Sequence, residues 1–202
     1  EHARLGEDEQ VQQWRERLEV IFIGVLNVRP IYSKISYVQA DQLASEIVAA
    51  SNPYSGAQAI PIQNYKNYTD SVVFNKTLSL NEGQIYFSDV TIEPADAQSG
   101  NARRLSFTVS TPVFDSASGE LFGAVLIEVD FGELLKRLDI KPLQGLDFYL
   151  ANRQGDYLLH PKQAKTLLFS NGLGGGLQND FPALQDSLLN NIKSESFRGV
   201  LD

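Results

Sequence analysis

Apolar residues recur with two different periods along the chain, and the change of period separates a helix from a set of strands. Over residues 7–28 they return every three to four positions with charged residues between them, which predicts one amphipathic helix that ends before Pro30. After Pro30 the period falls to two, the pattern of strands that bury one face. The expected strands are residues 31–38, 43–50, 84–92, 104–114 and 121–130.

Shorter helices and a second hairpin complete an α+β pattern. Residues 51–67 are rich in Pro, Gly, Ser, Asn and Gln and are expected to form a loop. Short helices are predicted at 68–80, from Phe131 onward and at 181–192. Two further strands at 147–151 and 157–160 should form a hairpin, and a last strand begins at residue 196.

A weak internal repeat indicates that the chain holds two similar modules. Residues 147–152 resemble residues 35–41, and the order of elements that follows each segment is also similar. We therefore divide the chain into an N-terminal helix (1–30), a first module (31–138) and a second module (139–202). The second module lacks the strands that would complete its sheet, so we expect it to be truncated within this sequence.

Composition and charge narrow the classes of function. Of the 202 residues, 43% are hydrophobic and 21% are charged, which is a composition that folds around a core. Lys and Arg number 17, Asp and Glu number 25, and the net charge of −8 argues against binding nucleic acid or an anionic membrane surface. Cysteine is absent, so the chain has no disulfide, no thiol nucleophile and no thiolate metal ligand.

Alternation sorts the three late strands of the first module into two faces. One face carries apolar residues and is expected to form the core: Ile85, Phe87, Leu105, Phe107, Val109, Val125, Ile127 and Val129. The other face carries Tyr86, Ser88, Ser106, Thr108, Ser110, Glu128 and Asp130. Sequential strands usually pair, so these polar residues should form one continuous surface. Alternation alone leaves open whether that surface is solvated or lines a polar pocket.

The order of elements and several local segments resemble the double Cache sensor family. The segments are IYSKISYVQAD at 31–41, GQIYFS at 83–88, STPVFD at 110–115, GAVLI at 123–127, DYLLHP at 156–161 and DFPAL at 180–184. This family consists of tandem PAS-like domains that lie outside the membrane in bacterial histidine kinases, diguanylate cyclases and chemoreceptors. The likeness extends from Arg17 over most of the chain, and its specificity lies in the order of the segments.

The resemblance implies a ligand pocket on the polar side of the first sheet. The candidate binding residues are Ser36, Tyr68, Ser71, Tyr86, Ser88, Thr108, Ser110, Glu128 and Asp130. Relatives that bind amino acids often carry arginine where this chain has Ser36 and Ser71, and only Asp130 fits their pattern. Because a carboxylate is best held by arginine, and this site holds two acids and no assigned base, we expect an amine, a polyol or a small heterocycle rather than a dicarboxylate.

Three functions are compatible with these observations. The leading hypothesis is the periplasmic or extracellular sensor region of a membrane-anchored bacterial receptor, in which a ligand in the first, membrane-distal module biases a cytoplasmic output domain. The first alternative is a ligand-free module for homodimerisation through the N-terminal helix or for docking another protein. The second is a hydrolase using Glu128 and Asp130, although no nucleophile accompanies them. We expect no cofactor and no metal, with His160 structural and the glycine run at 172–176 a surface loop.

Overall fold

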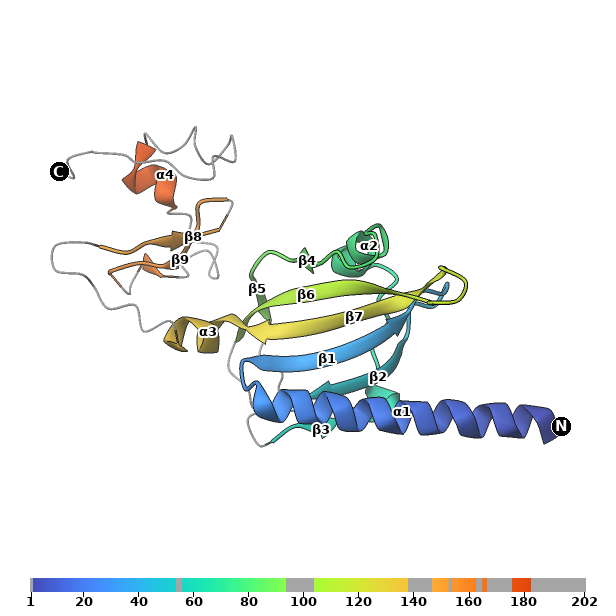
Figure 1. Ribbon diagram of the computed structural model, residues 1–202. Coiled ribbons are helices and arrows are strands. Elements are labelled where there is room, and N and C mark those ends of the chain that lie inside the picture. Colours follow the sequence, from blue (N-terminus) through green and yellow to red (C-terminus); the bar gives the residue numbers. More distant parts are fainter. Residues whose placement is uncertain are drawn as a thin grey trace. The chain divides into compact units, whose positions relative to one another are not determined.

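The structure is a computed structural model, and it describes residues 2–53, 56–93, 104–137, 147–152, 154–162, 165–166 and 176–182. The chain forms two compact units, Glu1–Asp139 and Ile140–Asp202, and each is described by itself. Within the described residues, the first unit combines a long helix, a seven-stranded antiparallel sheet and two short α-helices (Figure 1). The predicted α+β class with a long leading helix is confirmed.

Helix α1 (His2–Val28) begins before the predicted residue 7 and ends where the sequence indicates. Proline has no N–H to continue a helix, so Pro30 stops it. The Arg29 N–H donates to the Val25 carbonyl at 2.9 Å, and the Tyr32 N–H then donates to the Arg29 carbonyl at 2.8 Å. These two bonds close the last turn and lead the chain directly into the first strand.

The sheet has seven strands rather than the predicted five. They are β1 (Tyr32–Gln39), β2 (Glu46–Ser51), β3 (Gln58–Ala59), β4 (Tyr86–Phe87), β5 (Thr91–Glu93), β6 (Arg104–Phe114) and β7 (Leu121–Asp130). Their order is β3-β2-β1-β7-β6-β4, and β5 also pairs with β6. The count differs because residues 84–92 form parts of two short strands and because β3 arises within the segment predicted as a loop.

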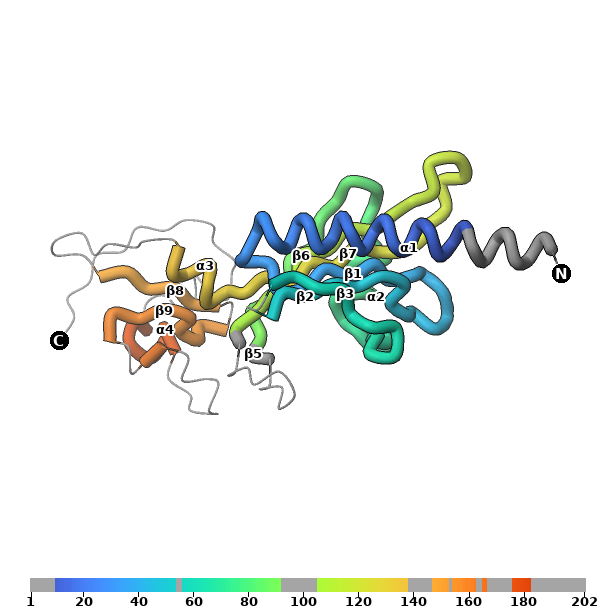
Figure 2. Tube along the Cα trace, turned by 90° about the horizontal axis from the view of Figure 1, so that it is seen from below, coloured from blue at the N-terminus to red at the C-terminus, as the bar shows by residue number. Residues whose placement is uncertain are grey.

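Two apolar clusters lie on opposite faces of this sheet. Phe22 and Leu26 of α1 pack on the face that carries Ile35, Tyr37 and Val48. On the other face, Phe74 of helix α2 (Val72–Leu78) packs with Val38, Ala44, Ala124 and Leu126. Because neighbouring residues of a strand point to opposite sides, the α1 face and the α2 face are built from alternate residues of the same strands. Figures 1 and 2 show α1 running along β1 and β2, and Figure 1 shows α2 beside β6.

One part of the predicted core face is wrong. Ile85 is 55% exposed and Phe87 is 63% exposed, although alternation placed both in the core. The reason is the position of α1, which contacts β1, β2 and β3 and does not extend over the same face of the sheet at β4. Sequence alternation shows which residues share a face, but it does not show how far a covering helix reaches.

The remaining elements are short. A 3-10 helix, η1 (Ile62–Asn64), precedes α2, and helix α3 (Phe131–Arg137) follows β7 directly, as predicted. In the second unit, β8 (Leu150–Ala151) and β9 (Tyr157–Leu159) pair as the expected hairpin, followed by α4 (Leu177–Asp180).

Two predictions from the sequence concern parts of the chain that the structure does not describe. The predicted strand from residue 196 and all but the first two residues of the helix at 181–192 lie outside the described residues. Within the described ranges, no helix is both long and apolar enough to span a membrane.

Candidate ligand-binding site

Strand register brings polar side chains into two adjacent rows on the α2 face. In the first row, Lys34 on β1 pairs with Glu128 on β7, which pairs with Thr108 on β6. In the second row, Ser36 pairs with Leu126, which pairs with Ser110. Paired residues of antiparallel strands point to the same side, so these side chains lie close together although they come from three strands.

Glu46, at the start of β2, is the centre of a buried hydrogen-bond network. Its Oε1 accepts from Lys34 Nζ at 2.5 Å and from the hydroxyls of Ser36 and Tyr68, both at 2.9 Å. Its Oε2 accepts from the Lys66 backbone N–H at 2.9 Å. We call Lys34, Ser36, Glu46 and Tyr68 the Glu46 network.

Both members of the central ion pair are buried. Lys34 is 6% exposed and Glu46 is 4% exposed. The Lys34 ammonium also lies 3.4 Å from the Tyr68 hydroxyl and 5.9 Å from the centre of the Tyr68 ring, so the tyrosine covers it. The Tyr68 ring in turn contacts Phe74 of α2 at a centroid distance of 6.2 Å. The ion pair is therefore enclosed between the sheet and the segment that leads into α2.

The network holds Glu46 charged and Tyr68 protonated. Burial alone would raise the pKa of Glu46, but the charge of Lys34 and the hydrogen bonds from Lys34, the Lys66 N–H and Ser36 outweigh burial, so the pKa lies below its ordinary value. Burial, followed by the charges of Glu46 and Glu128, raises the pKa of Tyr68. The site thus presents one cation and two nearby carboxylates among neutral hydroxyls.

Some of the predicted binding residues do lie together. Ser36 and Tyr68 belong to the Glu46 network, and Thr108 and Glu128 stand in the same row as Lys34. Ser110 is buried in the adjacent row, where its hydroxyl lies 2.5 Å from that of Thr77 on α2.

The other predicted residues have local structural contacts. Ser71 is the N-cap of α2, where its hydroxyl accepts from the Phe74 N–H at 3.2 Å. Asp130 accepts from the Glu133 N–H at 2.9 Å at the start of α3. The Ser88 hydroxyl accepts from the Thr108 N–H at 2.8 Å, which joins β6 to the segment after β4. The Lys76 ammonium lies 5.4 Å from the centre of the Tyr86 ring.

The expectation of a site with no base is wrong, because Lys34 lies at its centre. Sequence analysis overlooked both Lys34 and Glu46, although a signal was present. Lys34 shares strand parity with Ser36 and Val38, so alternation places it on the polar face, and Glu46 is a charged residue within a predicted strand. A lysine and a glutamate in otherwise apolar strands could have indicated a buried pair.

The arrangement supplies an ion pair and two hydroxyls, which are groups that form hydrogen bonds with polar molecules. Among the described residues, no group of three His, Cys, Asp or Glu side chains is placed to hold a metal ion.

His160 lies in the second unit, where its Nδ1 accepts from the Lys162 N–H at 2.8 Å. Asp180 of that unit accepts from the Tyr157 hydroxyl at 2.9 Å and from Lys165 at 2.7 Å. These contacts join the β9 hairpin to α4.

The model of the family named bacterial histidine kinase, sensor domain, matches residues 7–201. A search of curated proteins found no match to the chain.

Solved structures share the fold. One is the extracellular domain of vpHK1S-Z8, a protein assigned as a histidine kinase, with 17% identity, a TM-score of 0.68, and coverage of 85% of this chain and 63% of that one. A domain of a protein assigned to the sensory box/GGDEF family of Vibrio parahaemolyticus has 18% identity and a TM-score of 0.67, covering 91% and 69%. The periplasmic sensory domain of the Campylobacter jejuni chemoreceptor Tlp1 has 14% identity and a TM-score of 0.53, covering 87% and 65%. The chain thus spans about two thirds of the length of these structures.

Proposed function

The chain belongs to the family of bacterial histidine kinase sensor domains, and we propose that it is the extracytoplasmic sensor region of a membrane-anchored receptor. The sensor domain family is not itself catalytic, so any kinase or cyclase chemistry belongs to an output domain elsewhere in the parent protein. In this proposal the first unit is the membrane-distal module and binds a small ligand on its α2 face, and the second unit is the membrane-proximal module.

The observation that carries the ligand site is the buried Lys34–Glu46 pair. Removing two charges from water costs several kcal/mol per ion, and well-packed apolar residues of similar volume are often as stable or more stable. Stability alone therefore gives little reason to keep a lysine and a glutamate between this sheet and α2. Buried charges with shifted pKa values cluster at functional sites, which supports recognition of a polar ligand here.

The charges of the site favour an amine or a polyol over a dicarboxylate. Lys34 contributes one positive charge, and the carboxylates of Glu46 and Glu128 both stand near it. An incoming dicarboxylate would compete with Glu46 for one lysine and would face both acids. An ammonium group would instead be attracted by these carboxylates, and ligand hydroxyls could exchange hydrogen bonds with Ser36 and Tyr68.

The segment that leads into α2 supplies a route from the site to a change of conformation. Glu46 and Lys66 are joined twice, by the Lys66 N–H to Glu46 Oε2 and by the Glu46 N–H to the Lys66 carbonyl at 3.2 Å. A ligand that takes over one of the Glu46 contacts would favour a different position of residues 66–71. Such differential binding is how a ligand shifts a receptor between two states.

Titration calorimetry on the purified chain tests this function with putrescine, ethanolamine, sorbitol and succinate as probes. We expect binding of an amine or the polyol, weakened about 2- to 10-fold in Tyr68→Phe, which removes one hydroxyl from the network. The matched control is Tyr65→Phe, because the Tyr65 hydroxyl has no hydrogen-bond partner among the described residues. Tyr68-dependent binding of succinate would show that the charge argument is wrong, and no binding by any probe would favour the ligand-free alternative.

The ligand-free alternative is supported by the outer surface of α1. Val20 is 70% exposed and Val28 is 73% exposed, and Ile21 beside them is also exposed. An apolar stripe of this kind on a long helix is typical of a helix that packs against another helix. Sedimentation equilibrium tests it: a dimer that dissociates in Val20→Glu but not in Val72→Glu, an exposed valine of α2, would support homodimerisation through α1.

A further inference from the structure

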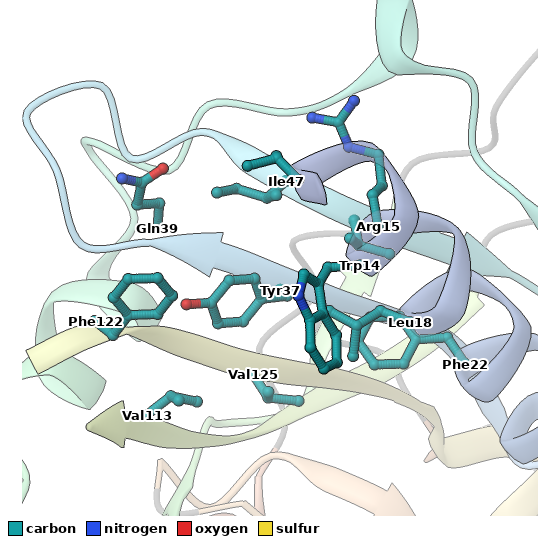
Figure 3. Close-up of a pocket in the computed structure, with 12 residues that line it drawn as sticks. Trp14, Arg15, Leu18, Phe22, Tyr37, Gln39, Ile47, Val113, Phe122 and Val125 are labelled. Carbon is teal, nitrogen blue, oxygen red and sulfur yellow. The ribbon is translucent and has the colours of Figure 1, made fainter. Parts of the chain in front are cut away.

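An apolar groove of about 650 Å³ lies between α1 and the sheet, on the face opposite the Glu46 network. Figure 3 shows its lining, with α1 on one side and β1, β6 and β7 below. Trp14, Leu18 and Phe22 come from α1, and Tyr37, Val113 and Val125 come from the sheet. The volume is in the range of sites that bind drug-sized molecules, which are concave and mainly apolar with a few placed polar groups.

Two buried polar atoms of the residues that line this groove, the Tyr37 hydroxyl and Arg15 Nε, lack a hydrogen-bond partner among the described residues. Tyr37 is only 8% exposed, and its hydroxyl is buried with no hydrogen-bond partner among the described residues. In Figure 3 the hydroxyl points along the groove toward Phe122, whose ring stacks on that of Tyr37 at a centroid distance of 6.2 Å. A buried donor without a partner is rare in proteins and is costly to the folded state.

The position of this hydroxyl depends on a glycine in the neighbouring strand. A Cβ at Gly123 would lie 2.8 Å from the Tyr37 hydroxyl and 2.4 Å from the Val38 carbonyl oxygen. Only glycine therefore lets the Tyr37 ring lie flat over β7 and reach along the groove. Burial raises the pKa of Tyr37 to about 12, so the hydroxyl stays protonated and can donate a hydrogen bond throughout the physiological range.

We propose that this groove is a second binding site, which takes a small, mainly apolar molecule whose hydrogen-bond acceptor, such as a ketone or ester oxygen, accepts a hydrogen bond from the Tyr37 hydroxyl. The apolar lining selects the body of the molecule, and the buried donors of Tyr37 and Arg15 select the acceptor.

A small molecule fits the groove better than a helix from a second copy does. The Tyr37 hydroxyl is enclosed between α1 and the strands, so an approaching helix would not reach it. The exposed residues Val20 and Ile21 line a separate hollow on α1 with Gln13, Glu16 and Arg17. A second copy could therefore pack on that stripe while the groove stays available.

The test uses prodan, a fluorescent naphthyl ketone, with the intact chain. Trp14 is the one tryptophan of the sequence and lines the groove. Bound prodan should therefore quench the Trp14 emission by energy transfer, and the prodan emission should shift to the blue. We expect micromolar binding, weakened about 2- to 10-fold in Tyr37→Phe by loss of one hydrogen bond. Val113→Phe should fill the groove and abolish binding, whereas Val72→Phe, on exposed surface of α2, should leave it unchanged.

A competition measurement covers the case in which Val113→Phe does not fold. Propiophenone should displace prodan at a lower concentration than propylbenzene of similar size, and this preference should disappear in Tyr37→Phe. Tyr68→Phe should leave prodan binding unchanged, which separates this site from the α2-face site. The proposal is overturned if folded protein does not bind prodan, or if Val113→Phe binds prodan as tightly as the native chain does. It is also overturned if the preference for the ketone survives in Tyr37→Phe, or if prodan binds only when a dimer dissociates.

Discussion

The two faces of the first unit's sheet are built from alternate residues of the same strands, yet they are covered in different ways. On the α1 face the covering side chains are apolar, and they leave a groove beside Tyr37. On the α2 face the cover includes a buried ion pair, and Glu46 accepts hydrogen bonds from donors of the sheet and of the segment before α2.

The difference shows how burial restricts the two kinds of surface. Apolar side chains lose only part of their packing when a groove remains beside them, and the unpartnered Tyr37 hydroxyl there is neutral, not a charge. A buried charge loses much more when one partner is removed, because the remaining charge has neither water nor a counter-ion. Removing one member of the ion pair on the α2 face should therefore cost more than truncating one apolar side chain on the α1 face.

The largest effect should follow from breaking the ion pair. Glu46→Gln leaves the Lys34 ammonium buried without a carboxylate, and we expect a loss of about 3–5 kcal/mol in the free energy of unfolding, measured with urea. Glu133→Gln, which breaks the exposed Lys136–Glu133 pair, should cost no more than about 1 kcal/mol. The double variant Lys34→Met/Glu46→Leu should recover most of the loss, and a double variant as unstable as Glu46→Gln would refute the argument from unpaired charge.

On the α1 face, a truncation in the apolar core should cost somewhat less. Leu26 is fully buried in the α1 cluster, and Leu26→Ala should lower the free energy of unfolding by about 3 kcal/mol. Val28→Ala, two residues further along the same helix and exposed, should change it by less than about 0.5 kcal/mol. Equal effects of the two substitutions would show that α1 does not hold the face as described.

Acid should weaken the α2 face selectively. The pKa of Glu46 is below its ordinary value in the folded state, so its contribution to stability is present above about pH 4.3 and is lost as the pH falls through the folded pKa. The loss should be smaller than that in Glu46→Gln at pH 7, because a protonated carboxyl still accepts hydrogen bonds. Urea unfolding between pH 7 and pH 3 should show a stability difference between the native chain and Glu46→Gln that narrows with acid, and a constant difference would contradict this.

The smallest effect concerns the helix that covers the α2 face. Ser71 caps α2 by accepting from the Phe74 N–H, and Ser71→Ala should cost about 1 kcal/mol. Ser71→Asp keeps an acceptor at the cap and should preserve most of the stability. If both variants bind the probe ligand of the α2 face as the native chain does, Ser71 has a structural role only, in place of the binding role expected from the sequence.

Sequence analysis was accurate where the pattern is local and failed where distant residues meet. The helix ending at Pro30, the long strands β6 and β7, and the resemblance to extracytoplasmic sensor domains were all predicted and are confirmed. Ser36 and Tyr68 were expected to lie near each other, and they do share one carboxylate. The identity of that carboxylate, Glu46, was not expected, because Glu46 follows a turn whose end the pattern placed three residues too early.

What the sequence by itself determined is the set of elements and the sorting of strand residues into two faces, because the periods of helix and strand are properties of neighbouring residues. Only the tertiary structure decided which face residues are covered. The position of α1 over β1 and β2 leaves Phe87 exposed and encloses Tyr37. The pairing of β1 with both β2 and β7 brings Lys34 to Glu46 and places Lys34 opposite Glu128. These outcomes depend on register and on helix placement between segments far apart in the chain, and no local period encodes either one.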